Sequence, residues 1–236
     1  MDNSNGKLYL VPTPIGNMGD ITQRALEVLG EVDIVACEDT RRSGSLLKKL
    51  GLSKKLVSYH DFNESTRAGQ LLDSIQEGKS VAVITDAGTP GISDPAYRVV
   101  RAAIDADIEI IPLPGPSSIL PALTASGLPT DRFFFEGFLP NKSGARRTRL
   151  GKLLDIPHTL IFLESPHRVV KCLTDIQEQF GDRQACLARE ITKLHEQFLR
   201  GSIGDILVAI SGRSIKGEIV LVVAGADRRT SRKGAE

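Results

Sequence analysis

The stretch that decides the fold is SVAVI (residues 80–84) followed directly by TDAGTPGISDP (residues 85–95). The first part is a short apolar run rich in β-branched residues, which is typical of a buried parallel strand. Residues 96–106 have the apolar spacing of a helix, with Asp94 as the expected N-cap and Pro95 at the first helical position. A strand, a glycine-rich turn and a helix in this order predict a ligand site at the strand's carboxyl end in an open α/β sheet. An ordinary turn between strand and helix would have a similar composition.

The same alternation of strand and helix runs through the first half of the chain. The other expected strands there are residues 7–11, 34–37, 56–59 and 108–113. The first helix is expected to begin with a capping-box pair, Asp20 and Gln23. Strands that alternate with helices imply right-handed crossovers and a mostly parallel sheet, so the segments after the strands should gather at one edge.

A second α/β unit is expected after the rigid segment PLPGPSS (residues 112–118). Its expected strands are residues 133–138, 159–163, 185–188 and 218–223, and residues 141–149 are expected to be a basic loop that leads into a helix. A further helix should end at Gly181, a favoured C-cap. We therefore expect one domain over residues 7–114, another over 115–226, and a disordered basic tail over 227–236.

Composition narrows the classes of function. The chain has 236 residues, 41% hydrophobic and 25% charged, as in ordinary soluble domains. Its 30 basic and 29 acidic residues give a net charge of +1, so no global attraction to nucleic acid is indicated. The three cysteines, an odd number without metal-ligand spacing, favour a reducing cytoplasmic compartment. No apolar stretch reaches membrane-spanning length, and residues 1–7 are too polar for a signal peptide.

The glycine-rich turns do not match known phosphate-binding loops. The sequence contains no G-x-x-x-x-G-K-[ST] motif, and no G-x-G-x-x-G opens a helix after the first strand. Pro12, Pro90 and Pro114 remove backbone N–H groups that a phosphate cradle needs. A ligand without phosphates, held by carbonyl groups, apolar walls and hydroxyls, fits better, and S-adenosylmethionine is such a ligand.

Seven motifs along the chain resemble, in order and spacing, those of the ribosomal RNA small subunit methyltransferase I family, a branch of the tetrapyrrole methylase superfamily. They are PTPIGN (12–17), CEDTR (37–41), DAGTPGISDP (86–95), PGPSS (114–118), ESPHR (164–168), ARE (188–190) with Lys193 and Glu196, and GE (217–218). The resemblance covers about residues 8–225.

The resemblance implies two α/β/α domains with the cofactor in the cleft between them, and a homodimer. It implies S-adenosyl-L-methionine as methyl donor and 2′-O-methylation of a cytidine in the decoding centre of 16S rRNA, within the small ribosomal subunit. The form of the turns at 12–17 and 88–90 argues against a porphyrin substrate. Three alternatives remain open: a tetrapyrrole acceptor, a protein acceptor, and a ribosome-assembly or RNA-binding protein without catalysis. A nucleotide-dependent kinase or synthase is disfavoured by the missing phosphate loop.

The motif resemblance implies that a set of residues in both domains contacts the cofactor. They are Pro14, Asp86, Gly88, Thr89, Ile92, Ser117, Ser118, Phe162, Leu163, Ala188, Gly217 and Glu218. Phe162 and Leu163 could instead be core residues, and the two serines could instead cap a helix. No metal ligands are expected.

Methyl transfer to a ribose hydroxyl needs positioning and benefits from a base. Glu190 is the first candidate base, and Glu38 and His60 follow because each comes directly after an expected strand. Glu190 could instead be part of an ion pair with Arg189 or Lys193, and His60 could only cap a helix. Arg41 and Lys193 complete the candidate catalytic set.

A basic cluster over residues 142–149 is the expected RNA contact. Its members are Lys142, Arg146, Arg147 and Arg149, and Arg42 and Arg168 could extend it. Charge runs of this kind are also common on solvated faces. Aromatic residues make up only 5% and tryptophan is absent, so the sequence gives little support for base stacking.

Overall fold

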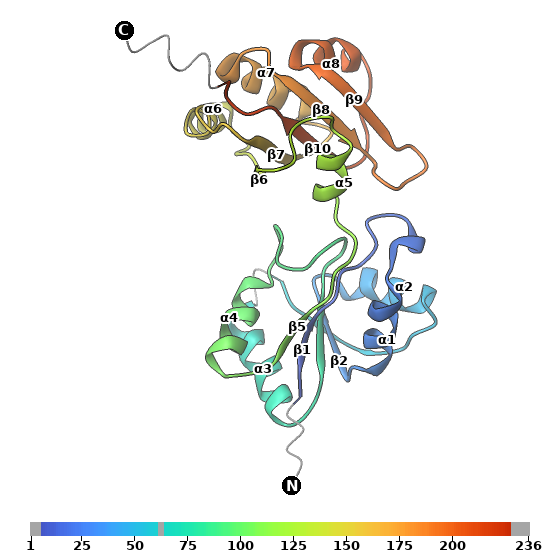
Figure 1. Cartoon of the computed structure of the whole chain (residues 1–236). Helices are drawn as coiled ribbons and strands as arrows, with labels where there is room; N and C mark the ends of the chain where they lie inside the picture. The colour runs from blue at the N-terminus through green and yellow to red at the C-terminus, as the bar shows by residue number, and fades with distance from the viewer. Residues whose placement is uncertain (1–5, 61–63, 228–236) are drawn as a thin grey trace. The chain divides into compact units, whose positions relative to one another are not determined.

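The computed structural model describes residues 6–60 and 64–227 (Figure 1). These residues form two compact units, divided between Ser117 and Ser118, and each unit is described by itself. The expected basic tail, apart from Asp227, and the first five residues of the amino-terminal segment lie outside the described residues. Within the described part, no helix is both long and apolar enough to cross a membrane.

The first unit is built on a five-stranded parallel sheet, as its alternating pattern predicts. The strands are β1 (Leu8–Leu10), β2 (Ile34–Cys37), β3 (Lys55–Ser58), β4 (Val81–Ile84) and β5 (Ile110–Pro112), in the order β3-β2-β4-β1-β5. Residues of β2 and β4 are buried throughout, because helices cover both faces of a parallel sheet. Parallel pairing brings all five carboxyl ends to one edge.

Helices pack on both faces of this sheet. They are α1 (Gln23–Glu31), α2 (Thr40–Lys49), α3 (Glu64–Gln76) and α4 (Tyr97–Asp105), with a short 3-10 turn, η1 (Met18–Asp20), before α1. Leu29 and Leu47 of α1 and α2 belong to the core on one face, with Val35 of the sheet. Leu71 and Val99 of α3 and α4 belong to the core on the other face.

Two expected helix starts in this unit are wrong. Thr22, not Asp20, is the N-cap of α1, and its hydroxyl accepts from the Ala25 N–H at 3.1 Å. Ala96, not Asp94, is the N-cap of α4, without a side-chain capping bond. The Asp94 carboxylate accepts from the Gly91 N–H instead, so it stabilises the turn rather than the helix. The residue types were right for capping, but the turn geometry decides which backbone N–H each side chain reaches.

The second unit has a five-stranded mixed sheet, unlike the parallel sheet of the first unit. The strands are β6 (Phe133–Phe138), β7 (Thr159–Glu164), β8 (Gln184–Arg189), β9 (Gln197–Ser202) and β10 (Ile219–Val223), in the order β6-β7-β10-β8-β9. Only β6 and β7 are parallel. Because β10 runs antiparallel to β7 and β8, its amino end lies beside their carboxyl ends.

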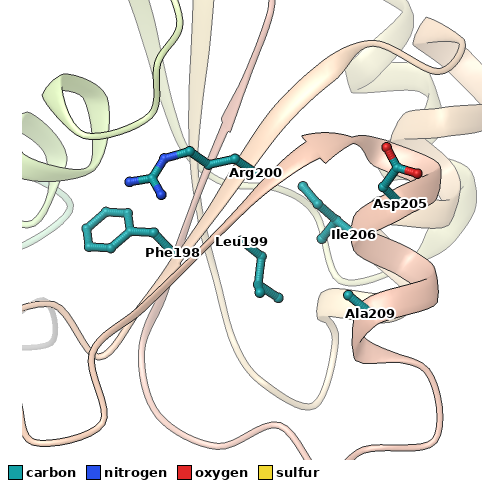
Figure 2. Close-up of a pocket in the computed structure, with 6 residues that line it drawn as sticks. All are labelled: Phe198, Leu199, Arg200, Asp205, Ile206 and Ala209. Carbon is teal, nitrogen blue, oxygen red and sulfur yellow. The ribbon is translucent and has the colours of Figure 1, made fainter.

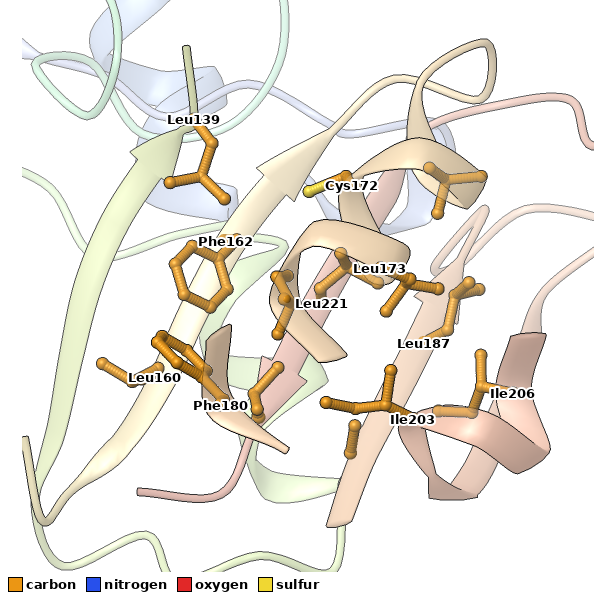
Figure 3. Close-up of a cluster of buried hydrophobic side chains, with 14 of the residues drawn as sticks. Leu139, Leu160, Phe162, Cys172, Leu173, Phe180, Leu187, Ile203, Ile206 and Leu221 are labelled. Carbon is orange, nitrogen blue, oxygen red and sulfur yellow. The ribbon is translucent and has the colours of Figure 1, made fainter. Parts of the chain in front are cut away.

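In its described residues, 118–227, the second unit has the helices α5 (Ile119–Thr124), α6 (Ser143–Gly151), α7 (Val169–Phe180) and α8 (Ile203–Ile210). Most of the segment expected as a basic loop at 141–149 is thus the helix α6. Gly181 ends α7 with φ +75°, as its C-cap role predicts. Figure 3 shows the core between the sheet and α7 and α8, where Phe162, Leu173 and Ile206 are buried.

A buried carboxylate fastens α6 to α7. Asp175 of α7 accepts from Arg146 Nε at 2.6 Å, from Arg147 Nε at 2.8 Å and from the Ser143 hydroxyl at 3.0 Å. Both Asp175 and Arg146 are 3% exposed. Burial raises the pKa of Asp175, but the hydrogen bonds from Arg147, Ser143 and Arg146 outweigh this effect and leave the pKa below its usual value.

We predict that Asp175→Asn destabilises the chain by about 3 kcal/mol, because it leaves the Arg146 guanidinium buried without a counter-charge. Urea unfolding measures the effect. Glu178→Gln is the control, since Glu178 meets Arg147 at the surface and its loss should leave the midpoint almost unchanged. The lowered pKa of Asp175 means that its contribution is present at neutral pH and lost in acid, so the difference should shrink below about pH 4. An unchanged midpoint for Asp175→Asn at neutral pH would contradict this reading.

Candidate cofactor-binding and active site

Two loops at the carboxyl edge of the first sheet are bonded directly to each other. Thr13, after β1, and Gly88, after β4, exchange two backbone hydrogen bonds of 2.9 Å each. The buried Thr13 hydroxyl also donates to the Thr85 carbonyl at 3.0 Å. These bonds hold the decisive stretch 85–95 against the loop at 12–17.

A third loop, after β5, packs against the other two. The Thr89 hydroxyl donates to the Pro116 carbonyl at 3.0 Å. Gly115 lies so close to Pro12 that a Cβ there would stand 2.7 Å from the proline Cβ. Gly88 has φ +89°, a conformation that favours glycine. The three loops therefore form one compact edge that includes Pro14, Ile92 and Ser117, as the sequence predicts for strand ends.

Asp86 carries an unpaired acceptor in this edge. Its Oδ2 atom accepts from Arg42 Nη1 at 2.8 Å. Its Oδ1 atom is buried and has no hydrogen-bond partner among the described residues. Since an unpaired buried carboxylate oxygen costs free energy, this atom suits a donor on a bound ligand. Arg42, expected to contact RNA, is placed here in an ion pair.

The other candidate residues of the first unit lie at the ends of β2 and β3. Glu38 is exposed and lines a small cavity with Thr85 and Asp94. His60 follows β3 and is half-buried. Arg41 is 90% exposed and binds Asp39, and its hydrogen bonds lower the pKa of Asp39 to about 2. Asp39 also caps α2, which explains the position of Arg41 without a catalytic role.

In the second unit, Glu190 lies in a compact cluster with Lys193 and Glu218. Lys193 Nζ is 2.9 Å from Glu190 Oε1 and 3.0 Å from Glu218 Oε2. The Glu218 N–H donates to the same Glu190 Oε1 at 3.0 Å. Gly217 is required beside them, because a Cβ there would stand 2.3 Å from the Glu190 carboxyl carbon. The antiparallel β10 brings residues 217–218 to the carboxyl end of β8, where Glu190 lies.

Opposing effects set the charges of this cluster. Burial raises the pKa of Glu190, but the Glu218 N–H and Lys193 outweigh it and leave the pKa below its usual value. Burial lowers the pKa of Lys193, but hydrogen bonds to Glu190 and Glu218 leave it raised. Both side chains are therefore charged at neutral pH. Of the two ion pairs left open by the sequence, the one with Lys193 is present, whereas Arg189 donates to Gln197 and to the Lys216 carbonyl.

The expected cofactor contacts on β7 and β8 divide between the two faces of the second sheet. Phe162 is fully buried in the core on the α7 side, as the alternative interpretation of this residue held. Leu163 and Ala188 lie on the opposite face, since side chains alternate along a strand. Ser118 occupies the N-cap position of α5 but makes no side-chain capping bond, so the alternative interpretation, in which its hydroxyl caps this helix, is not supported.

Most of the expected RNA-binding cations are already paired with carboxylates. Arg147 and the buried Arg146 bind Asp175, and burial keeps the Arg146 guanidinium from reaching a phosphate. Arg149 forms a two-bond pair with Glu136, at 2.5 and 2.6 Å. Arg168 binds the fully buried Glu164 at 3.0 Å. Lys142 is exposed at the start of α6. The sequence shows a basic run, but it does not show which acids from β6, β7 and α7 fold against it.

An open groove between β9 and α8 contains none of the expected site residues (Figure 2). Leu199, Ile206 and Ala209 give it an apolar lining. Its acidic residue, Asp205, belongs to the capping box of α8 with Ser202. In the described part of the chain, no group of three or more His, Cys, Asp or Glu residues could hold a metal ion.

Comparison with known proteins identifies the family. The model of the Tetrapyrrole (Corrin/Porphyrin) Methylases matches residues 7–207. A protein of Escherichia coli O157:H7 named "Ribosomal RNA small subunit methyltransferase I" is 50% identical over 227 residues, 95% of this chain and 79% of the relative. A protein of the same name from Micromonospora olivasterospora is 49% identical over 94% of this chain and 71% of the relative.

Solved structures agree on the fold. Cobalt precorrin-4 methyltransferase has a TM-score of 0.68 at 19% identity, with 95% of this chain and 97% of that chain covered. Uroporphyrin-III-C-methyltransferase of Thermus thermophilus has a TM-score of 0.61 at 22% identity, with 94% and 93% covered. The chain is thus a methyltransferase with S-adenosyl-L-methionine as its donor. It belongs to the tetrapyrrole methylase family, in the branch whose curated members are named ribosomal RNA small subunit methyltransferase I.

Proposed function

We propose that this chain methylates the 2′-hydroxyl of a cytidine in the decoding centre of 16S rRNA, within the small ribosomal subunit. The observation that carries the proposal is the near-50% identity to relatives named for the ribosomal RNA small subunit, over almost the whole chain. The cofactor edge and the charged cluster at Glu190 support a transfer reaction. We also propose that the enzyme works in the cytoplasm as a homodimer; its three cysteines are free and buried, which suits a reducing compartment.

The residues at the first sheet's carboxyl edge fit S-adenosyl-L-methionine. Asp86 Oδ1 offers a buried acceptor without a partner in the described chain, and a ligand amino or hydroxyl group can donate to it. Gly88 is buried beside it, where a side chain would take up room, and the partly buried Thr89 and Ser117 add hydroxyls. In the second unit we assign Leu163, Ala188 and Glu218 as further contacts to the cofactor. When bound, the cofactor supplies an electrophilic methyl group.

The chain itself must position the ribose, exclude water and accept the hydroxyl proton. We assign Glu190 as the base that accepts the proton of the ribose hydroxyl. Its Oε1 atom is held by Lys193 and the Glu218 N–H, which leaves Oε2 to accept the proton. Its lowered pKa keeps it ionised and ready at neutral pH. Glu38 and His60 of the first unit are the second candidates for this step.

Methyl transfer to purified small subunits tests the proposal most directly. Subunits from cells that lack this enzyme are incubated with labelled S-adenosyl-L-methionine, and the label is mapped by nuclease digestion. Label on a cytidine ribose is the expected result. Unlabelled subunits, together with label on a tetrapyrrole or a protein, would show that the acceptor is wrong.

For the cofactor site, we predict that Asp86→Ala weakens S-adenosyl-L-methionine binding about 10- to 100-fold. The reason is the loss of a charged acceptor, worth about 1.5–3 kcal/mol. Calorimetric titration measures the affinity. Asp105→Ala, an exposed carboxylate paired with Arg101 on α4, is the control and should bind like the unaltered enzyme. Equal affinities for the two variants would remove Asp86 from the site.

For the base, we predict that Glu190→Gln lowers turnover by about 10²- to 10⁴-fold and leaves cofactor affinity nearly intact. Glu196→Gln, in the same loop, should change turnover little, because Glu196 accepts from the Thr192 N–H of the loop at 2.6 Å and is exposed. The unaltered enzyme should lose activity in acid, as Glu190 becomes protonated below its usual range, and this acid limb should be absent from the residual activity of Glu190→Gln. Unchanged turnover in Glu190→Gln would exclude it as the base.

A further inference from the structure

One row of side chains crosses the whole second sheet and includes two of the proposed cofactor contacts. The strand register places Phe138, Leu163, Val220, Ala188 and Phe198 side by side. Directly paired residues of neighbouring strands point to the same face. The neighbours Phe162, Leu187 and Leu221 belong to the core on the opposite face. The row therefore lies on the face away from α7 and α8.

The row is buried at its centre and exposed at one end. Val220 is 3% exposed and Ala188 is fully buried, whereas Phe138 is 58% exposed. Phe138 ends β6, an outermost strand of the sheet. The outer side of an edge strand is not covered by a further strand, so this exposed aromatic ring is accessible to a partner. Phe138 is also the direct neighbour of Leu163, at a strand spacing of about 4.8 Å.

Charge makes this end of the row suitable for a polyanion. Glu136 is the acidic residue of β6, and Arg149 neutralises it with two hydrogen bonds. The exposed Lys142 follows Phe138 by four residues and begins α6. Arg149 thus contributes indirectly: it removes a negative charge from the strand on which Phe138 lies.

We propose that Phe138 stacks against an unpaired base of the rRNA, at or next to the methylated nucleotide, and that Lys142 contacts a phosphate beside it. This inference rests on the proposed function. Unpaired bases in RNA stack on aromatic side chains, and lysine side chains bind the backbone that connects them. The row continues from Phe138 to Leu163 and Ala188, so a base on Phe138 lies beside the residues assigned to the methyl donor.

The test compares Phe138→Leu with Phe134→Leu. Phe134 is on the same strand and 36% exposed, but it pairs with Leu160 and so faces the other side of the sheet. Filter binding to unmethylated small subunits gives Kd, and labelled methyl transfer gives KM and kcat. Phe138→Leu should raise Kd and KM for subunits about 5- to 100-fold, with the affinity for S-adenosyl-L-methionine unchanged. Phe138→Tyr should restore binding, and Lys142→Gln should reduce the salt dependence of log Kd by about one unit of slope.

Two results would overturn the assignment. Equal subunit affinities for Phe138→Leu and Phe134→Leu would show that no base stacks on Phe138. A change from dimer to monomer in Phe138→Leu, measured by sedimentation, would show that a second copy of the chain covers the strand. Failure of the proposed function would give a different result, in which the unaltered enzyme binds subunits without methylating them. The subunit Kd values of Phe138→Leu and Phe134→Leu would then still test the stacking.

Discussion

The pair of backbone hydrogen bonds between Thr13 and Gly88 is the constraint on which the first unit's site depends. It joins two loops that are far apart in sequence, and it requires positive φ at Gly88. The loop after β5 then packs on both through Gly115 and Thr89. Prolines in these loops remove donors but fix the backbone, so the edge is shaped by carbonyls, hydroxyls and one unpaired carboxylate oxygen. That donor-poor character matches a ligand without phosphates.

Much of this fold could be predicted because it rests on local patterns. Apolar β-branched runs located the strands of the first unit and four strands of the second to within two residues, and parallel order in the first unit followed from alternation. The remaining strand, β9, was not predicted. The antiparallel β10 could not be predicted in this way, since its direction depends on which strands it joins. That direction is what brings Glu218 to Glu190. The two wrong helix caps had the right residue types, but Asp94 was bonded within its own turn.

The basic run of α6 shows that the number of charged residues in a segment does not predict which of them are free to bind a ligand. Arg146 and Arg149 look alike in the sequence, yet one is buried against Asp175 and the other is paired with Glu136 on the neighbouring strand. Burial and pairing are decided by tertiary contacts, which no single motif contains. Conversely, the low aromatic content did not reveal that one aromatic side chain, Phe138, lies exposed in line with two proposed cofactor contacts. The position of each residue in the fold, rather than the number of basic or aromatic residues in the sequence, determines what it can bind.

We infer that the three loops bonded around Thr13 and Gly88 hold the methyl donor. Hydrogen–deuterium exchange with and without S-adenosyl-L-methionine tests this claim most directly, because it reads the backbone of every loop in one experiment. We expect ligand-dependent protection in peptides that cover residues 12–17, 85–95 and 113–118, and around Glu190 and Glu218. Protection centred on the groove between β9 and α8, with these loops unchanged, would contradict it.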